Sequence, residues 1–503
     1  MDTNPDILLN LNTELLADFD VEWLRRYPII PLYKEEGRIC FAAANPEDIE
    51  VKDQIQEALS EKVILKAADP LAIYRSLNRH YQHSDQLQTM AGDLAEKYQQ
   101  SYAKISNRSH IDLPSAVAES ISDCMNYIIA EAILHQASDI HVEPLETEIL
   151  IRFRVDGLLH EFDRLPMQFL QPLVSYIKVE ANMDITNMRL PQDGQIELNF
   201  KDYIFDLRIT SIPTILGEKL AIRLLEKQRL VLGLSDLGFR PDILTMIEHE
   251  IRQPFGLILV SGPTGSGKTS TLFSVLKTLQ SVDKNIVTIE DPVEYRLPLV
   301  NQMEIHNESG LDFAAASRCL LRQDPDVILL GEIRDSETAH TAIQSALAGT
   351  LLLSTIHSNH ALGSIDRLIN FGVDRFWVAA ALSSVLAQRL VRKICPYCKS
   401  EYKPNPEYLA GLGLDPKGTY THGAGCPACL HTGYIGRECI GEWVGINDDI
   451  RDAIYNNAAP ATLMDIAKNG DSYYSFKDSA KEKILGHITT VEEVARVLSI
   501  DKL

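Results

Sequence analysis

The sequence predicts an α/β protein with several domains, and three observations lead to that prediction. From Leu230 onward, short apolar runs alternate with helical patterns, which favours a mostly parallel sheet covered by helices. Before that point, turn signals such as Asp156-Gly157 join segments of alternating polarity, which is typical of a smaller α+β domain. A length of 503 residues is enough for roughly three domains.

The N-terminal part is expected to hold an acidic arm over residues 1–22 and a small domain over 23–81. The pattern of that domain is β-β-α-β-α, with a hairpin-like turn between the first two strands. Asn45 is expected to cap a helix that starts at the following proline and runs to Glu57. Residues 82–112 are polar and rich in Gln and Ser, so we expect a linker there.

A second domain is expected over residues 113–228, and the larger α/β domain over 229–503. In the second domain the period indicates a long helix followed by two hairpins. In the α/β domain the strands are short and apolar, and the tail over 447–503 is expected to be helical. The predicted strands are 148–155, 158–163, 195–200 and 203–210, and then 256–260, 285–290, 327–330 and 351–355.

Composition and charge exclude some classes of protein. Hydrophobic residues make up 45% and charged residues 23%, as in an ordinary soluble globular protein. The formal net charge of −22 argues against binding nucleic acid or anionic lipid by charge alone. No run of 18 apolar residues is present, and the start of the chain is acidic where a secretory signal is basic. We therefore expect a cytoplasmic protein with no nucleic-acid partner.

The sharpest motif is Gly-Pro-Thr-Gly-Ser-Gly-Lys-Thr at residues 262–269, which fits the phosphate-binding pattern G-x-x-x-x-G-K-[ST]. It follows a predicted strand and opens a predicted helix, so its main-chain N–H groups can surround a phosphate at a helix N-terminus. The alternative is a glycine-rich turn with a surface lysine. Lys268 would reach the outer phosphates and Thr269 would ligate Mg²⁺. The candidate nucleotide-binding residues here are Gly262, Pro263, Thr264, Gly265, Ser266, Gly267, Lys268, Thr269 and Ser270.

Acidic and polar residues follow the neighbouring strands. Glu332 comes after the strand at 327–330, where a carboxylate can orient and deprotonate an attacking water or hold Mg²⁺ through water. It could instead only favour a helix dipole. Glu290 and Glu294 follow another strand. His357 follows a third and could sense the outermost phosphate or bridge to Glu332, although a single histidine at a strand end is often structural.

Arginines form a third group of candidates. A guanidinium placed on the γ-phosphate can be worth about 10³–10⁵ in rate. The spacing of the arginines along the sequence does not indicate which of them fills this role. The candidates are Arg208 and Arg223 in the second domain, and Arg318, Arg322 and Arg334 in the α/β domain.

Two Cys-x-x-Cys pairs predict a zinc module over residues 392–441. The pairs are Cys395/Cys398 and Cys426/Cys429, and four thiolates suit a closed, structural tetrahedral site. The alternative is four reduced thiols without metal.

Together these motifs resemble the secretion ATPase family that powers type II secretion and type IV pilus assembly, the GspE/PilB family. The resemblance runs from about Val117 to the C-terminus, and the motifs fall in the family's order. They are Ser138-Asp-Ile-His-Val-Glu143, Arg189-Leu-Pro-Gln-Asp-Gly194, Gly217-Glu-Lys219, the phosphate loop, Glu290-Asp-Pro-Val-Glu294, Leu329-Leu-Gly-Glu332, Thr355-Ile-His357 and the four cysteines.

The resemblance implies a RecA-like ATPase domain preceded by a PAS-like α+β domain, within a homohexamer that uses ATP, Mg²⁺ and Zn²⁺. It implies that Glu332, Lys268 and His357 act in catalysis together with Arg208 and Arg223. It places further residues near phosphate: Glu290, Glu294, Arg318, Arg322, Arg334 and Arg437.

The same resemblance implies a motor that assembles a type II secretion pseudopilus and so drives protein export. The alternative is a type IV pilus extension motor, and DNA translocation or a non-hydrolysing scaffold is less favoured. The expected partners are an inner-membrane platform protein and a membrane-anchored assembly protein, the latter bound by the 23–81 docking domain. The protein would then lie peripherally at the inner membrane.

Overall fold

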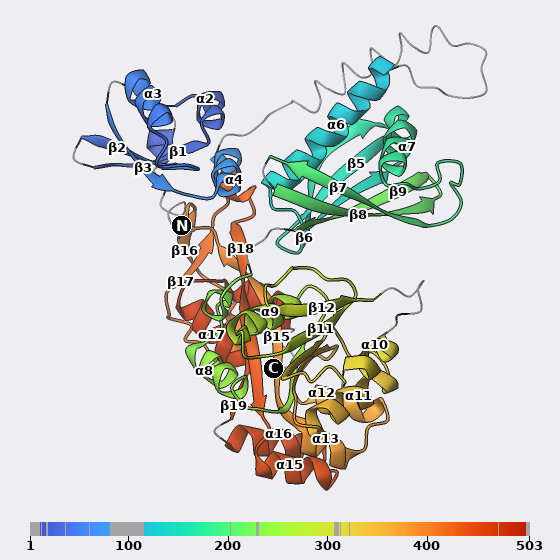
Figure 1. The fold of residues 1–503 in the computed structure, drawn as a ribbon. Coiled ribbons are helices and arrows are strands. Elements are labelled where there is room, and N and C mark those ends of the chain that lie inside the picture. Colours follow the sequence, from blue (N-terminus) through green and yellow to red (C-terminus); the bar gives the residue numbers. More distant parts are fainter. Residues whose placement is uncertain are drawn as a thin grey trace. The chain divides into compact units, whose positions relative to one another are not determined.

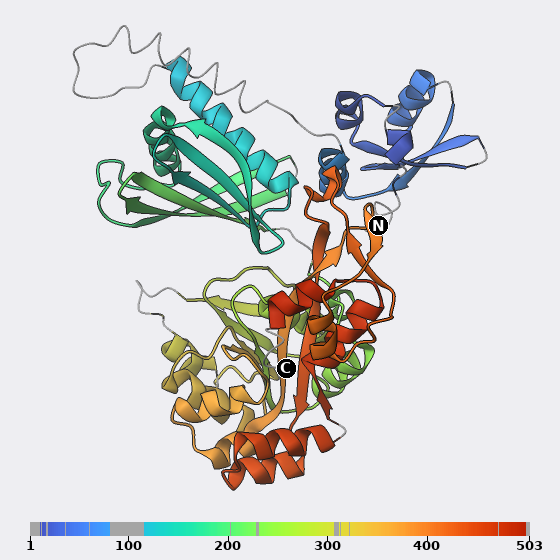
Figure 2. The ribbon, with the colours of Figure 1, turned by 180° about the vertical axis from the view of Figure 1, so that it is seen from behind.

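The computed structural model is drawn from two opposite sides in Figures 1 and 2. It forms two compact units: the first consists of residues 1–227 with the short segments 396–398 and 425–433, and the second of the remainder. The expected linker over 82–112 lies outside the described residues, as does most of the expected acidic arm. The described residues are 11, 13–16, 19–35, 37–59, 61–80, 115–201, 203–227, 231–305, 311, 313–320, 322–470 and 472–498.

The N-terminal domain is a three-stranded sheet packed against short helices. β1 (Ile29–Glu35) and β2 (Arg38–Ala43) are antiparallel, and β3 (Lys62–Ala67) pairs parallel with β2. The expected β-β-α-β-α order is confirmed by these strands and two helices. The helices of this domain are α1 (Thr13–Leu16), α2 (Val21–Arg26), α3 (Ile49–Leu59) and α4 (Pro70–His80).

The start of α3 differs from the prediction. The residues after Asn45 form a turn, in which the Asn45 side chain accepts from the Glu47 N–H at 3.3 Å. Asp48 takes the capping role, because its carboxylate accepts from the Val51 N–H at 3.1 Å. The helix therefore begins at Ile49, three residues later than expected.

The second domain of this unit is a six-stranded antiparallel sheet of order β6-β5-β4-β9-β8-β7. The four strands expected here are present, although β6, β7 and β8 extend beyond their predicted bounds, and β4 and β9 were not predicted. The strands are β4 (Asp139–Pro144), β5 (Glu148–Val155), β6 (Leu158–Pro166), β7 (Gln192–Phe200), β8 (Tyr203–Thr214) and β9 (Gly217–Glu226).

Helices α6 (Ser115–Leu134) and α7 (Leu170–Glu180) cover one face of this sheet (Figures 1 and 2). Their residues share one buried cluster with the inward side chains of the strands, including Leu207 and Ile209 of β8. Because side chains alternate along a strand, Arg208 between those two residues lies on the opposite face. The packing of the apolar face thus fixes which polar residues line the other.

The second unit is built on an eight-stranded sheet of order β12-β11-β13-β14-β10-β15-β18-β19. The first six of these strands are parallel, which confirms the expected α/β class, and the last two pairings are antiparallel. The strands are β10 (Gly256–Ser261), β11 (Ile286–Glu290), β12 (Val300–Glu304), β13 (Val327–Leu330), β14 (Leu351–Ile356), β15 (Leu382–Ile394), β18 (Tyr434–Gly445) and β19 (Tyr473–Tyr474).

Both faces of the central strands β10, β11, β13 and β14 are buried, which explains why these strands consist mostly of apolar residues. Ile258 and Val260 share a cluster with residues of α8 (Pro241–Glu250) and α9 (Lys268–Leu279). Leu257 and Leu259 join the cluster on the other face. The helices on that face are α10 (Phe313–Leu320), α11 (Ser336–Leu347), α12 (Gly363–Asn370), α13 (Arg375–Ala381), α14 (Pro406–Leu412), α15 (Asp448–Tyr455), α16 (Pro460–Asn469), α17 (Phe476–Leu485) and α18 (Val491–Leu498).

The C-terminal tail is helical as expected, with α15, α16, α17 and α18 and the short edge strand β19 between them. A small hairpin of β16 (Lys399–Tyr402) and β17 (Tyr420–Gly423) separates the two cysteine pairs. In the described part of the chain, no helix is both long and apolar enough to cross a bilayer.

Candidate functional site

The predicted chemical motifs of the second unit meet at one edge of its parallel sheet. The phosphate loop joins β10 to α9, Glu332 follows β13, and His357 follows β14. These strands are neighbours in the order β13-β14-β10, so their carboxyl ends lie side by side. In open α/β sheets this edge is where ligands bind.

The phosphate loop has groups that suit an anion. The Lys268 ammonium donates to the main-chain oxygens of Gly262 at 3.0 Å and Pro263 at 3.1 Å, so it lies over the loop. Burial lowers the pKa of Lys268, and the charge of Glu332 acts in the opposite direction. The Ser266 hydroxyl is buried, and the described residues provide no hydrogen-bond partner for it. A phosphate chain would accept from both groups.

Glu332 is the centre of a cluster of charged side chains. Its Oε2 lies 3.5 Å from His357 Nε2, and its other oxygen pairs with Arg334. Arg334 also lies 3.8 Å from an oxygen of Asp291. The loop that carries Glu332 is held to β14, since the Ile333 N–H donates to the Thr355 oxygen at 2.9 Å. Three predicted residues, from two strand ends, are therefore in contact.

Glu290 is placed differently from the other acidic candidates. It is buried at the end of β11, where one oxygen accepts from the Thr288 hydroxyl at 2.6 Å and from the Gln302 amide at 3.1 Å. Burial raises the pKa of Glu290, while these hydrogen bonds lower it, and the net direction is upward. The hydrogen bonds from β11 and β12 thus hold this carboxyl within the sheet. Glu294 is exposed in the loop after β11.

The arginine candidates of this unit belong to different elements. Arg334 pairs with Glu332. Arg322 is exposed just after α10, with its guanidinium 3.5 Å from the Cys319 sulfur. Arg318 belongs to α10 and Arg437 to β18.

Two functional candidates were missed by the sequence reasoning, and both come from β15. The Gln388 amide donates to the main-chain oxygen of Ser266 in the phosphate loop at 2.7 Å. The Arg389 guanidinium donates to the main-chain oxygen of Asn359, two residues after His357, at 2.9 Å. The signal was available, because a Gln-Arg pair interrupts an otherwise apolar run, but that strand was not predicted.

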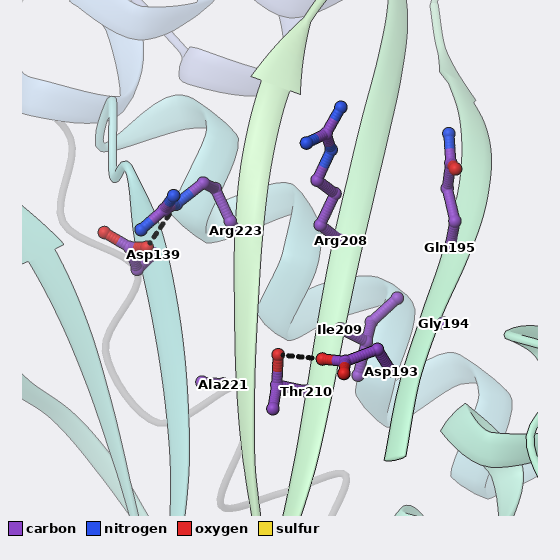
Figure 3. A pocket seen from close by; sticks show the side chains of 9 residues that line it. All are labelled: Asp139, Asp193, Gly194, Gln195, Arg208, Ile209, Thr210, Ala221 and Arg223. Atoms are coloured by element: carbon purple, nitrogen blue, oxygen red, sulfur yellow. Dashed lines mark hydrogen bonds and ion pairs between the residues drawn. The ribbon is translucent and has the colours of Figure 1, made fainter. Parts of the chain in front are cut away.

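In the first unit, Arg208 and Arg223 lie on adjacent strands and in register with each other. They line a pocket of about 550 Å³ on the face of the sheet opposite α6 and α7 (Figure 3). Arg223 pairs with Asp139 at 3.1 Å, and Asp139 also lies 3.5 Å from Arg154 on the next strand. The Arg208 guanidinium, 3.7 Å from Asp206, is the second positive charge of the pocket, whose lining also includes the carboxylates of Asp139 and Asp193.

The four predicted cysteines come together. The sulfurs of Cys395, Cys398, Cys426 and Cys429 all lie within 4.8 Å of one another. Two of the separations, 3.7 and 3.9 Å, match the edge of about 3.8 Å that a tetrahedron with Zn–S bonds of about 2.3 Å requires. Burial raises the pKa of the Cys429 thiol, but hydrogen bonds to its sulfur, among them those from the N–H groups of Cys426 and Gly433, lower the pKa by more. The net direction is downward. Such donors suit a metal-bound thiolate.

The fold and the sheet-edge site define a P-loop NTPase with a RecA-like core. The chain belongs to the family described as Type II/IV secretion system protein, which matches residues 115–496. The N-terminal part matches the MshEN domain over residues 8–87. The family suggested by the motifs is therefore confirmed.

Two relatives carry the names of this family's two branches. The chain is 38% identical over 479 residues to a type IV pilus assembly ATPase PilB of Thermus thermophilus, and the match covers 93% of this chain and 53% of that protein. It thus spans about half the length of that relative. It is 43% identical over 373 residues to a type II secretion system protein E of Dickeya dadantii, covering 74% of each.

Solved structures agree on the fold. The Legionella pneumophila ATPase DotB superposes with a TM-score of 0.58 at 19% identity, over 75% of this chain and 95% of that one. The pilus retraction motor PilT, crystallised with bound ADP, gives a TM-score of 0.50 at 26% identity, over 73% of this chain and 95% of that one.

Proposed function

We propose that this protein is an ATP-hydrolysing motor that assembles the pseudopilus of a type II secretion system and so drives protein export. The observation that carries the proposal is the meeting of the phosphate loop, Glu332 and His357 at one sheet edge. A nucleotide bound by the loop at that edge has its outer phosphate next to a carboxylate that can direct a water.

In the proposed reaction, the phosphate loop binds the triphosphate through its main-chain N–H groups and Lys268. The Thr269 hydroxyl, in the first turn of α9, would hold Mg²⁺, and the ion would supply positive charge that offsets the charge of the phosphates. Glu332 accepts a hydrogen bond from a water and takes its proton as the oxygen attacks the γ-phosphorus. The bond to the β-phosphate oxygen breaks, and ADP and phosphate leave. His357 keeps the carboxylate of Glu332 in place.

We propose that the working form is a homohexamer in which Arg208 and Arg223 enclose the nucleotide. Their pocket carries two guanidinium groups on one exposed sheet face, which matches the charge that develops on a transferred phosphoryl group. If these arginines act across subunits, the specific activity rises with protein concentration and reaches a plateau. A specific activity that is independent of concentration contradicts this assembly.

A type IV pilus extension motor is the second candidate. The 38% identity to the PilB relative, over 93% of the chain, supports it. Both candidates share the ATPase chemistry and differ only in the fibre that is assembled.

The proposed partners follow from the family. An inner-membrane platform protein receives the motion of the ring, and the N-terminal domain docks a membrane-anchored assembly protein. The motor then lies in the cytoplasm, peripherally at the inner membrane. Zn²⁺ bound by the four cysteines is proposed to be structural, because all four positions of a tetrahedral site are filled by protein sulfur. No nucleic acid is required, so added DNA leaves ATP hydrolysis unchanged.

Replacing Lys268 tests the nucleotide site. Lys268→Ala removes the ammonium from the loop, so binding of ATP and ADP is expected to be lost in calorimetry, together with phosphate release. Lys277→Ala is the matched control, because that lysine lies on the same helix and donates to the Val231 oxygen outside the loop. Tight ATP binding by Lys268→Ala contradicts the assignment.

A cellular experiment separates the two candidates. The Lys268→Ala allele, placed in the native host, is expected to stop the release of exported proteins into the medium while surface fibres persist. Loss of surface pili with normal export supports the pilus motor instead. Normal export and normal pili exclude both.

A further inference from the structure

The strand β15 places a glutamine directly against the phosphate loop. β15 runs parallel to β10, with Ala387 opposite Ser261, so the next residue, Gln388, lies beside the start of the loop. Its side chain is completely buried. A buried primary amide is retained only where its donors and acceptor find partners, because an unpaired one costs several kcal/mol.

Both ends of the Gln388 amide are used, and the orientation of the amide is determined by its partners. Nε2 donates to the Ser266 main-chain oxygen at 2.7 Å, and Oε1 accepts from the Thr271 hydroxyl at 2.8 Å. A main-chain oxygen can only accept, so the nitrogen of the amide must face Ser266. One side chain thus bridges the end of the phosphate loop and the first turns of α9.

The bond to Ser266 fixes the direction of an N–H group. The peptide that joins Ser266 to Gly267 is planar and trans, so its C=O and its N–H point in opposite directions. Drawing the Ser266 oxygen toward β15 therefore aims the Gly267 N–H away from β15. Main-chain N–H groups of this loop are the groups that bind phosphate.

The phosphate loop is packed closely against Gln388, at two of its glycines. Gly267 has a φ of 87°, and a Cβ there would lie 3.1 Å from the Gln388 amide nitrogen. Gly262, at the other end of the loop, has a φ of 151°, and a Cβ there would lie 2.7 Å from the Gln388 main-chain oxygen. The two glycines allow the loop to close around one residue of β15.

Arg389 links the Gln388 main-chain oxygen to the loop that follows β14. Arg389 donates from one guanidinium nitrogen to the Gln388 oxygen at 2.9 Å and from another to the Asn359 oxygen at 2.9 Å. The segment just after His357 is thereby tied to the strand that holds the phosphate loop.

We propose that Gln388 is a positioning residue for nucleotide binding: through its bond to the Ser266 oxygen it holds the Ser266–Gly267 peptide in the orientation that presents the Gly267 N–H group to the phosphate chain. The inference rests on the proposed function and adds a residue outside the phosphate-loop motif. Gln388 itself touches no phosphate. Its loss weakens the binding of any nucleotide with a phosphate chain and leaves the water-directing group in place.

The variant Gln388→Met tests this, because methionine matches the volume and forms neither hydrogen bond. The dissociation constant for ADP, measured by calorimetry on the full-length protein, is expected to rise at least about tenfold. The KM for ATP is expected to rise in step, with kcat within about threefold of wild type, because ground and transition states lose the same interaction. A lower kcat with unchanged KM shows a smaller active fraction and overturns the proposal.

Two further variants distinguish the loss of the hydrogen bond to Ser266 from a loss of packing around residue 388. Thr271→Val removes the bond on the helix side and leaves Ser266 bonded, so ADP affinity is expected to stay within about threefold. Gln388→Glu keeps an acceptor for Thr271 and turns an acceptor toward the Ser266 oxygen, so its ADP affinity is expected to fall at least as far as that of Gln388→Met. Equal losses in Thr271→Val and Gln388→Met overturn the proposal.

If Gln388→Met does not fold, as judged by thermal unfolding, Gln388→Glu is measured against the same thresholds. Unchanged ADP affinity in the folded variant overturns the inference. A wild-type protein that binds neither ADP nor ATP overturns the proposed function instead, so the two failures are distinct.

Discussion

His357 and Glu332, which end neighbouring parallel strands, face each other with 3.5 Å between Nε2 and Oε2. Arg334 contacts the other oxygen of the same carboxylate. The side chain of Glu332 is only 18% exposed, whereas that of His357 is 50% exposed. A carboxylate held from both sides has few orientations available, which is what a group that directs a water needs. The exposed imidazole is the member of the pair that an incoming phosphate can meet.

Arg223 is expected to matter more than Arg154, although both arginines pair with Asp139. Arg223 lines the pocket of Figure 3, whereas Arg154 is not among its lining residues and donates instead to the Gly157 oxygen. Arg223→Gln should lower ATP turnover at least about tenfold, since a guanidinium on the γ-phosphate can be worth about 10³–10⁵. Arg154→Gln should hydrolyse ATP normally. Equal turnover in the two variants would show that the pocket has no part in hydrolysis.

The cysteine cluster is expected to hold one zinc ion per chain. Cys398→Ser should lose the metal and lower the thermal midpoint, because a structural zinc contributes folding free energy. Cys439→Ser is the control: this cysteine is outside the cluster, and burial raises the pKa of its thiol to about 12. Metal analysis and thermal unfolding check both variants. Wild-type protein that contains no zinc and takes up none would disprove the site.

Part of the fold could be predicted because its signals are local. The strands that carry Glu332 and His357 are short apolar runs with a polar residue directly at their ends, and the phosphate loop is one contiguous motif. The three could be expected to meet because parallel neighbours share an edge. The four cysteines were predicted for the same reason, since each pair has a fixed local spacing.

The roles of Gln388 and Arg389 could not be predicted, because their partners are far away in the sequence. Gln388 and Arg389 are buried in β15, where a polar pair argues against a core strand. Their partners Ser266 and Asn359 lie 122 and 30 residues away, and no local pattern indicates such pairs. The start of α3 shifted for a different reason, because two capping residues, Asn45 and Asp48, compete within four positions.

The C-terminal helix α18 should detach from β15 at low pH. The buried Glu493 carboxylate accepts from Arg392 at 2.8 Å and from Arg496 at 2.6 Å. Burial alone would raise the pKa of Glu493, but the bonds from Arg496 and Arg392 outweigh it, so the pKa lies below its ordinary value of 4.5. A carboxylate with a depressed pKa stabilises the fold above that ordinary value and loses this contribution as the pH falls through the folded pKa.

Glu493→Gln tests this linkage. The variant should unfold at a lower temperature than wild type at pH 7, because it leaves the largely buried Arg392 guanidinium without its counter-charge. The difference between the two proteins should shrink as the pH falls below 4.5, since wild type then loses the same charge. Thermal unfolding at a series of pH values measures the difference. A difference that stays constant down to pH 3 would contradict the ionised state of Glu493 in the folded protein.

Hydrolysis by the proposed mechanism depends most on Glu332, and one paired measurement tests the role of this residue: ATP binding and phosphate release by Glu332→Gln at a fixed protein concentration. The amide keeps the size of the side chain and cannot take a proton from water. The variant is expected to bind ATP with an affinity close to that of wild type and to release phosphate at least about 100-fold more slowly. Phosphate release at the wild-type rate would contradict the proposed mechanism.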